Sequence, residues 1–412
     1  MKEKKTMEVI SLASIPLMMT LGNSMLIPVL PTIEHKLHIS SLQSSLIITV
    51  YSVVAIIFIP IAGYLSDRIG RMKVIIPSLI LTGIGGLVAG FGSMFFGQSY
   101  WLILIGRFLQ GIGSSGAFPV VMPLVGDLFR SEKQVSAALG VLETANTFGK
   151  VLSPILGALF AAVIWYFPFF AIPMLCLISI IMVGASVKVP KNNDQAPPFH
   201  TFIKNIKAIF KQKGRWLVAI FAIGCIIMFI LFGTLFYLSE ILESHYHVKS
   251  VRKGIIIAMP LFALSIASLV TGKQIGQNKI LMKWLTVAGM FLTMVSMVLL
   301  SFQMNIRLFL FWLFIGGVGI GVALPTLDAF ITIGIEKENR GTITSLYSSM
   351  RYIGVALGPP LFALMMKGSV RLMFLVAAAT ALAGAIFALL AIKPKAKKPK
   401  EEPTNNPKLK PI

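Results

Sequence analysis

Apolar runs of about 20 residues recur from one end of this 412-residue chain to the other, each separated from the next by a short polar break. A helix needs about that many apolar residues to cross a bilayer. Twelve such runs can be counted, with approximate spans 8–30, 45–65, 74–95, 101–126, 136–162, 166–187, 216–240, 254–272, 281–302, 308–333, 342–366 and 371–392. The sequence therefore predicts an all-α membrane protein with twelve transmembrane helices in a lipid bilayer.

Composition excludes the other broad classes. Hydrophobic residues make up 56% of the chain and charged residues only 13%, with a mean hydropathy of +0.85, whereas soluble domains carry about 25% charged residues. The net charge of +22 does not indicate a nucleic-acid partner, because the basic residues sit in the polar breaks without interleaved aromatic residues. Cys176 and Cys225 lie inside apolar runs, which excludes a disulfide scaffold.

The distribution of Lys and Arg among the breaks predicts the orientation. Breaks on the side that holds both termini carry 27 basic residues, and those on the other side carry seven. The positive-inside rule then places both termini in the cytoplasm. The first apolar run is too long for a signal peptide and lacks a small-residue cleavage site, so we expect it to remain as the first helix of a multi-pass protein of the plasma membrane.

The longest polar break, 188–215, divides the chain into two six-helix halves, 1–187 and 216–392. This break is basic and is expected to be a cytoplasmic linker. Its part 199–213 is amphipathic and fits either a helix lying on the membrane surface or a solvated linker. The tail 393–412 is rich in Lys, Pro and Asn and is expected to be disordered and cytoplasmic.

The two halves resemble each other at a shift of about 205 residues. Gly149 and Pro154 in the fifth run fall on Gly354 and Pro359 in the eleventh, and the break 69–73 is echoed by 275–279. Duplicated units of this kind are common in transporters. We therefore expect the halves to be pseudo-symmetric.

The break after the second run is unusually polar for a simple connection. It holds Gly63, Asp67, Arg68, Gly70 and Arg71. These residues resemble the signature loop Gly-x-Leu-x-Asp-Arg-x-Gly-Arg between the second and third helices of the major facilitator superfamily. The resemblance implies that fold, with twelve helices in two halves.

The same resemblance implies that Asp67 belongs to a charge lock on the cytoplasmic face. A carboxylate there would be favoured by the dipole of the eleventh helix if that helix begins near 341–343. Arg71 or Arg130 is expected to pair with it.

The fourth run contains one full charge, Arg107, followed by Gln110, Gly111 and Gly113. A charge inside the membrane is costly unless it is paired or wet. Two interpretations remain open: the side chain snorkels to the outer surface, or it faces a central cavity. The segment resembles the superfamily motif Arg-x-x-Gln-Gly-x-Gly, which implies the cavity and a role in proton coupling, with Arg107 favouring the ionised form of a nearby carboxylate.

The fifth run carries a polar stripe on one helical face, formed by Glu143, Asn146, Thr147 and Lys150. Such a stripe must face protein or a watery cavity and not lipid. Downstream, the residues Gly149, Ser153, Pro154 and Gly157 resemble the antiporter motif Gly-x-x-x-Gly-Pro-x-x-Gly-Gly, with Ser153 standing for a glycine. In the superfamily this motif accompanies drug:proton antiporters, which implies export.

Two carboxylates are candidates for proton coupling, because a carboxylate in a low-dielectric cavity can exchange protons near neutral pH. Glu143 is the first choice and Asp328 the second. The alternative is a structural ion pair, of Glu143 with Lys150 or Arg351, or of Asp328 with a cytoplasmic lysine. Lys150 departs from the family pattern and favours an anionic or zwitterionic substrate. Residues expected to line the cavity are Asn23, Gln110, Asn146, Lys150, Arg351 and Tyr352.

These features predict a bacterial, proton-coupled antiporter of the multidrug type. It would export small lipophilic or amphiphilic compounds by alternating access, as a monomer with no cofactor and no metal. A dedicated exporter of one metabolite, a siderophore or a glycolipid, is the alternative within transport. A membrane-embedded enzyme or receptor is disfavoured, because no cluster suited to catalysis is evident. The absence of a Gly-x-x-x-x-Gly-Lys loop argues against direct use of ATP.

Overall fold

The computed structural model describes residues 2–95, 99–129, 131–187, 199–302, 305–335 and 337–393. Every regular element in this part of the chain is a helix. The elements are α1 (Lys2–Ser24), the short 3₁₀ helix η1 (Ile27–Val29), α2 (Leu30–Leu37), α3 (Ser41–Ile69), α4 (Arg71–Met94), α5 (Tyr100–Leu128), α6 (Glu132–Val163), α7 (Phe167–Ser186), α8 (Phe199–Ser244), α9 (Ser250–Ile275), α10 (Lys279–Leu300), α11 (Ile306–Gly334), α12 (Lys337–Met365) and α13 (Val370–Ala391). The expected all-α architecture is confirmed.

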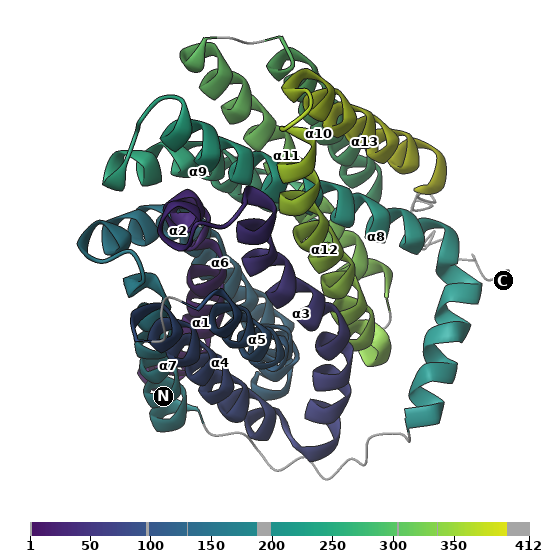
Figure 1. Ribbon diagram of the computed structural model, residues 1–412. Helices are drawn as coiled ribbons and strands as arrows, with labels where there is room; N and C mark the ends of the chain where they lie inside the picture. The colour runs from purple at the N-terminus through teal and green to yellow at the C-terminus, as the bar shows by residue number, and fades with distance from the viewer. Residues whose placement is uncertain are drawn as a thin grey trace, which may run out of the picture.

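The helices form two halves, α1–α7 and α8–α13; the first occupies the lower left of Figure 1, and the second its top and right side. The packing pairs within one half have exact counterparts in the other: α4 packs on α5 as α10 packs on α11, and α1 packs on α6 as α8 packs on α12. The contacts of α3 with α5 and of α4 with α7 are likewise matched by α9 with α11 and α10 with α13. This correspondence extends the sequence repeat to the whole helix arrangement.

Two helix pairs make the main contacts between the halves, α3 with α12 and α6 with α9. They are equivalent under the same repeat, because α9 is the counterpart of α3 and α12 that of α6. Each spanning helix crosses the bundle once, so the turns alternate between two ends. We call the end where α1 begins and α13 ends the terminal face, and the other end the opposite face.

The first predicted span is not a single helix. Its helix α1 ends at Ser24, η1 follows, and α2 continues to Leu37. Pro28 falls in this interruption and Pro31 in the first turn of α2, and neither has the backbone N–H that a continuous helix needs. The break leaves carbonyl groups free near the opposite face, and one of them, on Ile27, accepts a hydrogen bond from the other half.

The seventh helix starts earlier than its apolar pattern indicates. α8 begins at Phe199 and runs without interruption to Ser244, so the segment 199–215 is helical and continuous with the seventh span. Its N-terminal part extends beside the bundle at the right of Figure 1. The rest of the predicted linker, 188–198, and the predicted disordered tail from 394 onward lie outside the described residues.

By length and apolarity alone, eleven segments of the described chain are able to cross a membrane. The twelfth predicted helix, α12, is present as 29 helical residues but is too polar for that criterion. It packs along both α3 and α8, so its polar side chains face protein. Its place at the interface between the halves explains its composition.

The turns after α3 and after α9 share an unusual backbone. Gly70 has φ +104° and Gly276 has φ +49°, a region that residues with a side chain rarely adopt. Both glycines end a helix at the terminal face, at equivalent positions of the two halves. The glycine of the signature loop thus makes a sharp turn from α3 into α4.

Candidate functional site

Charged side chains from both halves gather between α6, α11 and α12. An Arg351 Nη1 atom on α12 lies 3.7 Å from Asp328 Oδ1 on α11. Lys150 on α6 interacts electrostatically with both of them and with Glu143 on its own helix. Solvent reaches the Asp328 and Arg351 side chains, which are 42% and 23% exposed. These four groups, Glu143, Lys150, Asp328 and Arg351, are called the central cluster below.

The polar stripe predicted on the fifth span faces protein, as expected. Asn146 donates from Nδ2 to Glu143 Oε1 at 3.2 Å and accepts from Thr20 of α1 at 2.6 Å. Thr147 also donates to Glu143, at 3.5 Å. Within the described residues Glu143 has no ion-pair partner inside 4.0 Å, so the alternative of a structural pair with Lys150 or Arg351 is not supported. Asp328 does form an ion pair, but with Arg351 and not with a lysine of the terminal face.

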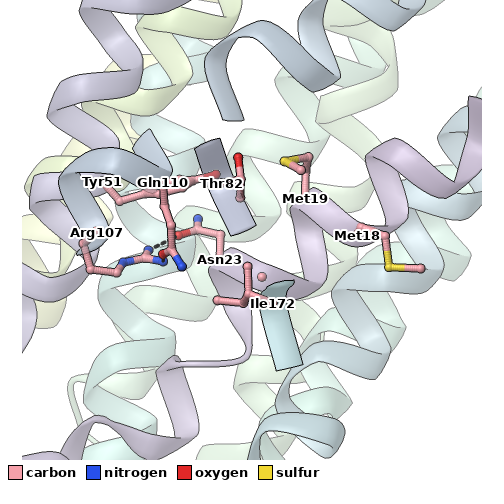
Figure 2. Close-up of a pocket in the computed structure, with 9 residues that line it drawn as sticks. Met18, Met19, Asn23, Tyr51, Thr82, Arg107, Gln110 and Ile172 are labelled. Carbon is pink, nitrogen blue, oxygen red and sulfur yellow. Dashed lines mark hydrogen bonds between the residues drawn. The ribbon is translucent and has the colours of Figure 1, made fainter. Parts of the chain in front are cut away.

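Arg107 is completely buried, so the snorkelling interpretation is wrong. Its Nε donates to the Ile47 carbonyl at 2.9 Å, one Nη donates to Gln110 Oε1 at 2.6 Å, and the other donates to Asn23 Oδ1 at 2.8 Å. The guanidinium carbon lies 4.4 Å from the centre of the Tyr51 ring, within the range of a cation–π contact. Figure 2 shows Asn23, Gln110 and Tyr51 beside the guanidinium.

The expected carboxylate beside Arg107 is not found among the described residues. Neutral dipoles and an aromatic face balance its charge instead, and Gln110 Nε2 remains buried without a hydrogen-bond partner there. The surrounding pocket lies within the N-terminal half (Figure 2) and is lined by Met18, Met19, Gly22, Asn23, Tyr51, Thr82, Arg107, Gln110 and Ile172. Asn23 and Gln110, both predicted cavity residues, are therefore grouped with Arg107 and not with the central cluster.

Tyr352 connects this pocket to the other half. Its ring centre on α12 lies 6.2 Å from that of Tyr51 on α3, at an interplanar angle of 49°. Nearby, Thr49 of α3 donates to the Ala356 carbonyl of α12 at 2.9 Å. Tyr347, one turn before Arg351, lies under its guanidinium with 5.6 Å between the guanidinium carbon and the ring centre. The α3–α12 contact thus joins the helix that carries Tyr51, at the Arg107 pocket, to the helix that carries Arg351 of the central cluster.

The predicted charge lock lies at the terminal face. Arg71 pairs with Asp67 one turn earlier, bonds Asp127 of α5 at 3.1 Å and donates to Ser66 Oγ at 2.8 Å. Asp67 and Arg71 line a pocket with Gly341 and other residues of α12. Of the two predicted partners of Asp67, Arg71 is confirmed and Arg130 lies outside the described residues.

The predicted role of the α12 dipole in that lock is wrong. α12 begins at Lys337, so Gly341 lies in its second turn and not at its N-terminus. Free backbone N–H groups, which carry the positive end of the dipole, occur only in the first turn. The halves meet here through close packing of α3 on α12. A Cβ on Gly63 of α3 would lie only 3.0 Å from Ser345 Oγ of α12. Among the described residues, Arg68 makes no hydrogen bond or ion pair with the groups of the lock.

The antiporter motif brings α6 into close contact with α1 and α9. A Cβ on Gly157 would lie 2.0 Å from the Met25 carbonyl oxygen, and one on Gly149 would lie 3.2 Å from that of Leu17. Ser153 donates to the Thr20 carbonyl of α1 at 3.2 Å. On the other side of α6, the Pro154 carbonyl touches Gly254 of α9. The motif therefore permits helix packing across the half interface, which is why small residues suffice at its positions.

Gly157→Ala is expected to lower the free energy of unfolding by about 1–3 kcal/mol, because the added methyl overlaps a backbone oxygen that cannot move away alone. Gly184→Ala in α7 is the matched control, since its methyl meets nothing within 4 Å and alanine favours a helix. Denaturation of the purified protein in detergent measures both. Equal stability of the two variants would contradict the close contact.

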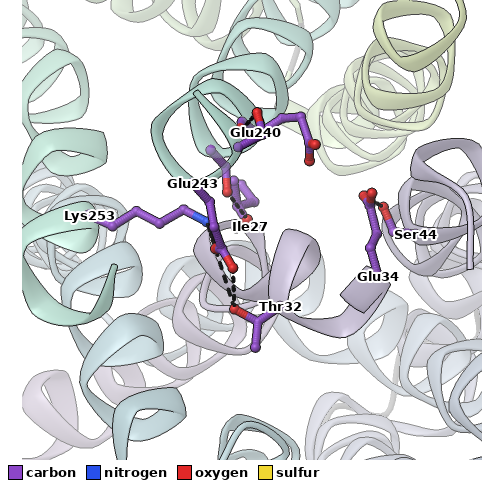
Figure 3. Close-up of polar contacts among 9 residues, drawn as sticks. Ile27, Thr32, Glu34, Ser44, Glu240, Glu243 and Lys253 are labelled. Carbon is purple, nitrogen blue, oxygen red and sulfur yellow. Dashed lines mark hydrogen bonds and ion pairs between the residues drawn. The ribbon is translucent and has the colours of Figure 1, made fainter. Parts of the chain in front are cut away.

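A second polar network, which the sequence analysis missed, lies at the opposite face (Figure 3). Lys253 Nζ of α9 lies 2.6 Å from Glu243 Oε2 of α8, and the two side chains are only 2% and 9% exposed. Thr32 of α2 donates to Glu243 Oε1 at 3.1 Å, and Ser239 of α8 donates to the Ile27 carbonyl at 2.7 Å. The last two bonds join the halves, so the opposite face is closed.

Two more carboxylates belong to this network. Glu34 of α2 accepts hydrogen bonds from Ser44 and, at 2.8 Å, from Ser41, both on α3. Glu240 of α8 interacts electrostatically with Glu34, Glu243 and Lys253. A signal was present in the sequence, since Glu240 and Glu243 end an apolar run and Lys253 begins the next. We call Glu34, Glu240, Glu243 and Lys253 the opposite-face cluster.

Comparisons with known proteins agree with this architecture. The family model described as Major Facilitator Superfamily matches residues 12–359 and 254–412. The Bacillibactin exporter of Bacillus subtilis (strain 168) is 54% identical over 395 residues, covering 96% of this chain and 98% of that protein. Multidrug resistance protein 2 of the same organism is 25% identical over 393 residues, covering 91% and 92%.

Among solved structures, the human organic anion transporter MFSD10 superposes with a TM-score of 0.73 at 16% identity, covering 93% of this chain and 99% of that one. A likeness at this identity concerns the fold. Together with the twelve-helix arrangement, its internal repeat and the signature loop, these matches lead to one conclusion: the chain belongs to the Major Facilitator Superfamily.

Proposed function

We propose that this protein is a proton-coupled exporter dedicated to one metabolite, and that the metabolite is bacillibactin or a close chemical relative. The Bacillibactin exporter, which is 54% identical over nearly the full length of both chains, supports this choice. This similarity favours the dedicated exporter over the broad multidrug antiporter, since the relative named as a multidrug resistance protein is only 25% identical. We propose further that the terminal face is cytoplasmic, in a bacterial plasma membrane, and that one chain forms the whole pathway.

The observation that carries the mechanism is the central cluster, which takes charged groups from both halves. Glu143 and Lys150 come from α6, whereas Asp328 and Arg351 come from α11 and α12. Motion of one half against the other must change the distances among these groups. The interactions among these charges therefore change with the motion that alternating access requires.

Competition for a carboxylate supplies the coupling. An ionised carboxylate accepts hydrogen bonds from O–H or N–H groups of a substrate, and a bound proton removes that acceptor. Glu143 remains the first choice, because its hydrogen-bond partners are the neutral Asn146 and Thr147 and a proton can bind without breaking an ion pair. Asp328 is second, since protonation there gives up its contact with Arg351. Lys150 and Arg351 would hold an anionic part of the substrate.

A proteoliposome assay tests this function. Vesicles with an acidic lumen and an enclosed pH-sensitive dye are diluted into neutral buffer, and bacillibactin, lipophilic cations or zwitterionic drugs are added outside. Molecules with the terminal face outward are expected to exchange external bacillibactin for luminal protons, which raises the luminal pH. A response to lipophilic cations but not to bacillibactin would contradict the dedicated exporter. A response to none of these compounds would contradict both forms of the proposal.

Loss of the terminal-face lock is expected to affect transport more than stability. Arg71→Gln removes the cation between Asp67 and Asp127, which are 44% and 42% exposed, and exposed pairs contribute about 1 kcal/mol or less. The substitution should nevertheless lower the exchange rate in the vesicle assay, because the terminal face loses the Arg71 bridge that joins α4 to α5. Lys73→Gln, an exposed change on the same helix, is the control. A normal rate in Arg71→Gln would remove this lock from the cycle.

A further inference from the structure

We propose that Glu34 and Glu240 form a proton-operated gate on the opposite face, which closes when protons bind there and opens when both carboxylates are ionised. This inference rests on the proposed function in one respect, that the opposite face is the external one. Its test requires no substrate, so it can fail while the export function holds.

The two carboxylates come from different halves. Glu34 lies on α2 of the N-terminal half and Glu240 on α8 of the C-terminal half, and Figure 3 shows their carboxyl groups turned toward each other. The face is closed around them by the Thr32–Glu243 and Ser239–Ile27 hydrogen bonds. Separation of the halves at this face would move Glu34 away from Glu240, while Glu243 and Lys253 would stay together on the same half.

The cluster contains more negative than positive charge. Lys253 is its one cation among the described residues and is already bonded to Glu243 at 2.6 Å. Glu34 faces the hydroxyl groups of Ser41 and Ser44 on α3. The exposed His35 on its own helix and Lys253 of α9 also interact with it electrostatically. The groups that act on Glu240 are Glu34, Glu243 and Lys253. Its Oε2 atom is buried and has no hydrogen-bond partner in the described part of the chain.

This arrangement links closure to proton binding. Two carboxylates brought together away from water repel each other, and burying a charge without a partner is costly. A proton on either group removes the repulsion and supplies an O–H donor for the other. Each proton taken up on closing changes the ratio of closed to open molecules by up to about tenfold per pH unit.

Closure of the opposite face on proton binding suits an exporter that is driven by external protons. After substrate leaves, an acidic exterior would favour closure of the opposite face. The protein would then return to the conformation that is open to the cytoplasm. Protons bound in this gate can leave to the same side when it opens. The gate therefore biases the conformational equilibrium, and the central cluster carries the transported proton.

Distance measurements between spin labels test the gate. In a background with Cys176→Ala and Cys225→Ala, labels are attached at Phe95→Cys, after α4, and at Leu308→Cys, in α11; both positions are exposed at the opposite face. Pulsed electron resonance of the full chain in nanodiscs, without substrate, gives the fractions with short and long distances between pH 5.5 and 8. The short distance is expected to dominate in acid, with at least a tenfold change in ratio across this range.

Glu34→Gln with Glu240→Gln is expected to keep the short distance at both pH values, because neither side chain can then ionise. Glu8→Gln, the same change near the start of α1, should retain the wild-type response. A pH response that persists in the Glu34/Glu240 variant, or is lost in Glu8→Gln, would overturn the gate, as would a wild-type ratio that does not change with pH.

Discussion

Replacing Glu143 by glutamine is expected to reduce bacillibactin-driven proton exchange by tenfold or more in the vesicle assay. Glutamine keeps the size of the side chain and an oxygen that can accept from Asn146 and Thr147, so the fold of α6 should persist. It can no longer bind and release a proton, so the proton flux is no longer coupled to the flux of bacillibactin. The comparison that assigns the coupling site is with Asp328→Asn, measured in the same vesicles.

Glu8→Gln is the matched control for that result, because it makes the same chemical change far from the central cluster. If Glu143→Gln exchanges normally and Asp328→Asn does not, the coupling site moves to Asp328. Binding of bacillibactin to each detergent-purified variant, measured by calorimetry, separates loss of coupling from loss of the substrate site. Full activity in both variants would exclude these two carboxylates as carriers of the proton.

Replacing Lys253 by methionine is expected to lower the free energy of unfolding by about 3–5 kcal/mol. The change removes the ammonium group from a buried ion pair of 2.6 Å and leaves the Glu243 carboxylate, which is 9% exposed, with Thr32 as its remaining donor. Removal of one partner from a buried pair costs this much because the other charge stays without compensation. Denaturation in detergent measures the loss.

A second substitution distinguishes the charge from the shape. Lys253→Met combined with Glu243→Gln should recover most of the stability, since the uncompensated charge is gone. Arg252→Met, at the exposed neighbouring position of α9, should cost less than about 0.5 kcal/mol. Failure of the double variant to recover would show that packing of the lysine side chain, and not its charge, stabilises this face.

Much of the architecture was determined by the sequence itself. The twelve apolar runs correspond to the helices that cross the bundle. In lipid, a single segment can satisfy all of its backbone hydrogen-bonding groups by forming a helix. The repeat at a shift of about 205 residues predicted equivalent helix pairs. The polar stripe of Glu143 and Asn146 was predictable too, since residues three apart share a helical face.

Helix boundaries were less determined by the sequence. Apolar side chains continue through Met25 and Leu26, so hydropathy gives no sign that α1 ends there, although Pro28 does. In the same way α8 begins at Phe199, well before its apolar part, because a polar helix can extend into water. The position of the α12 N-terminus, and with it the dipole predicted to face Asp67, depended on such a boundary.

Only the tertiary structure decided which distant residues meet. Thr32 and Glu243 lie 211 positions apart, and Arg107 and Asn23 lie 84 apart; no periodicity along one helix contains such pairings. The partner of Arg107 was expected to be a carboxylate, but packing supplied neutral dipoles and the Tyr51 ring. The opposite-face cluster was missed for the same reason, because its carboxylates look like ordinary helix ends until the fold brings Glu34 of one half beside Glu240 of the other.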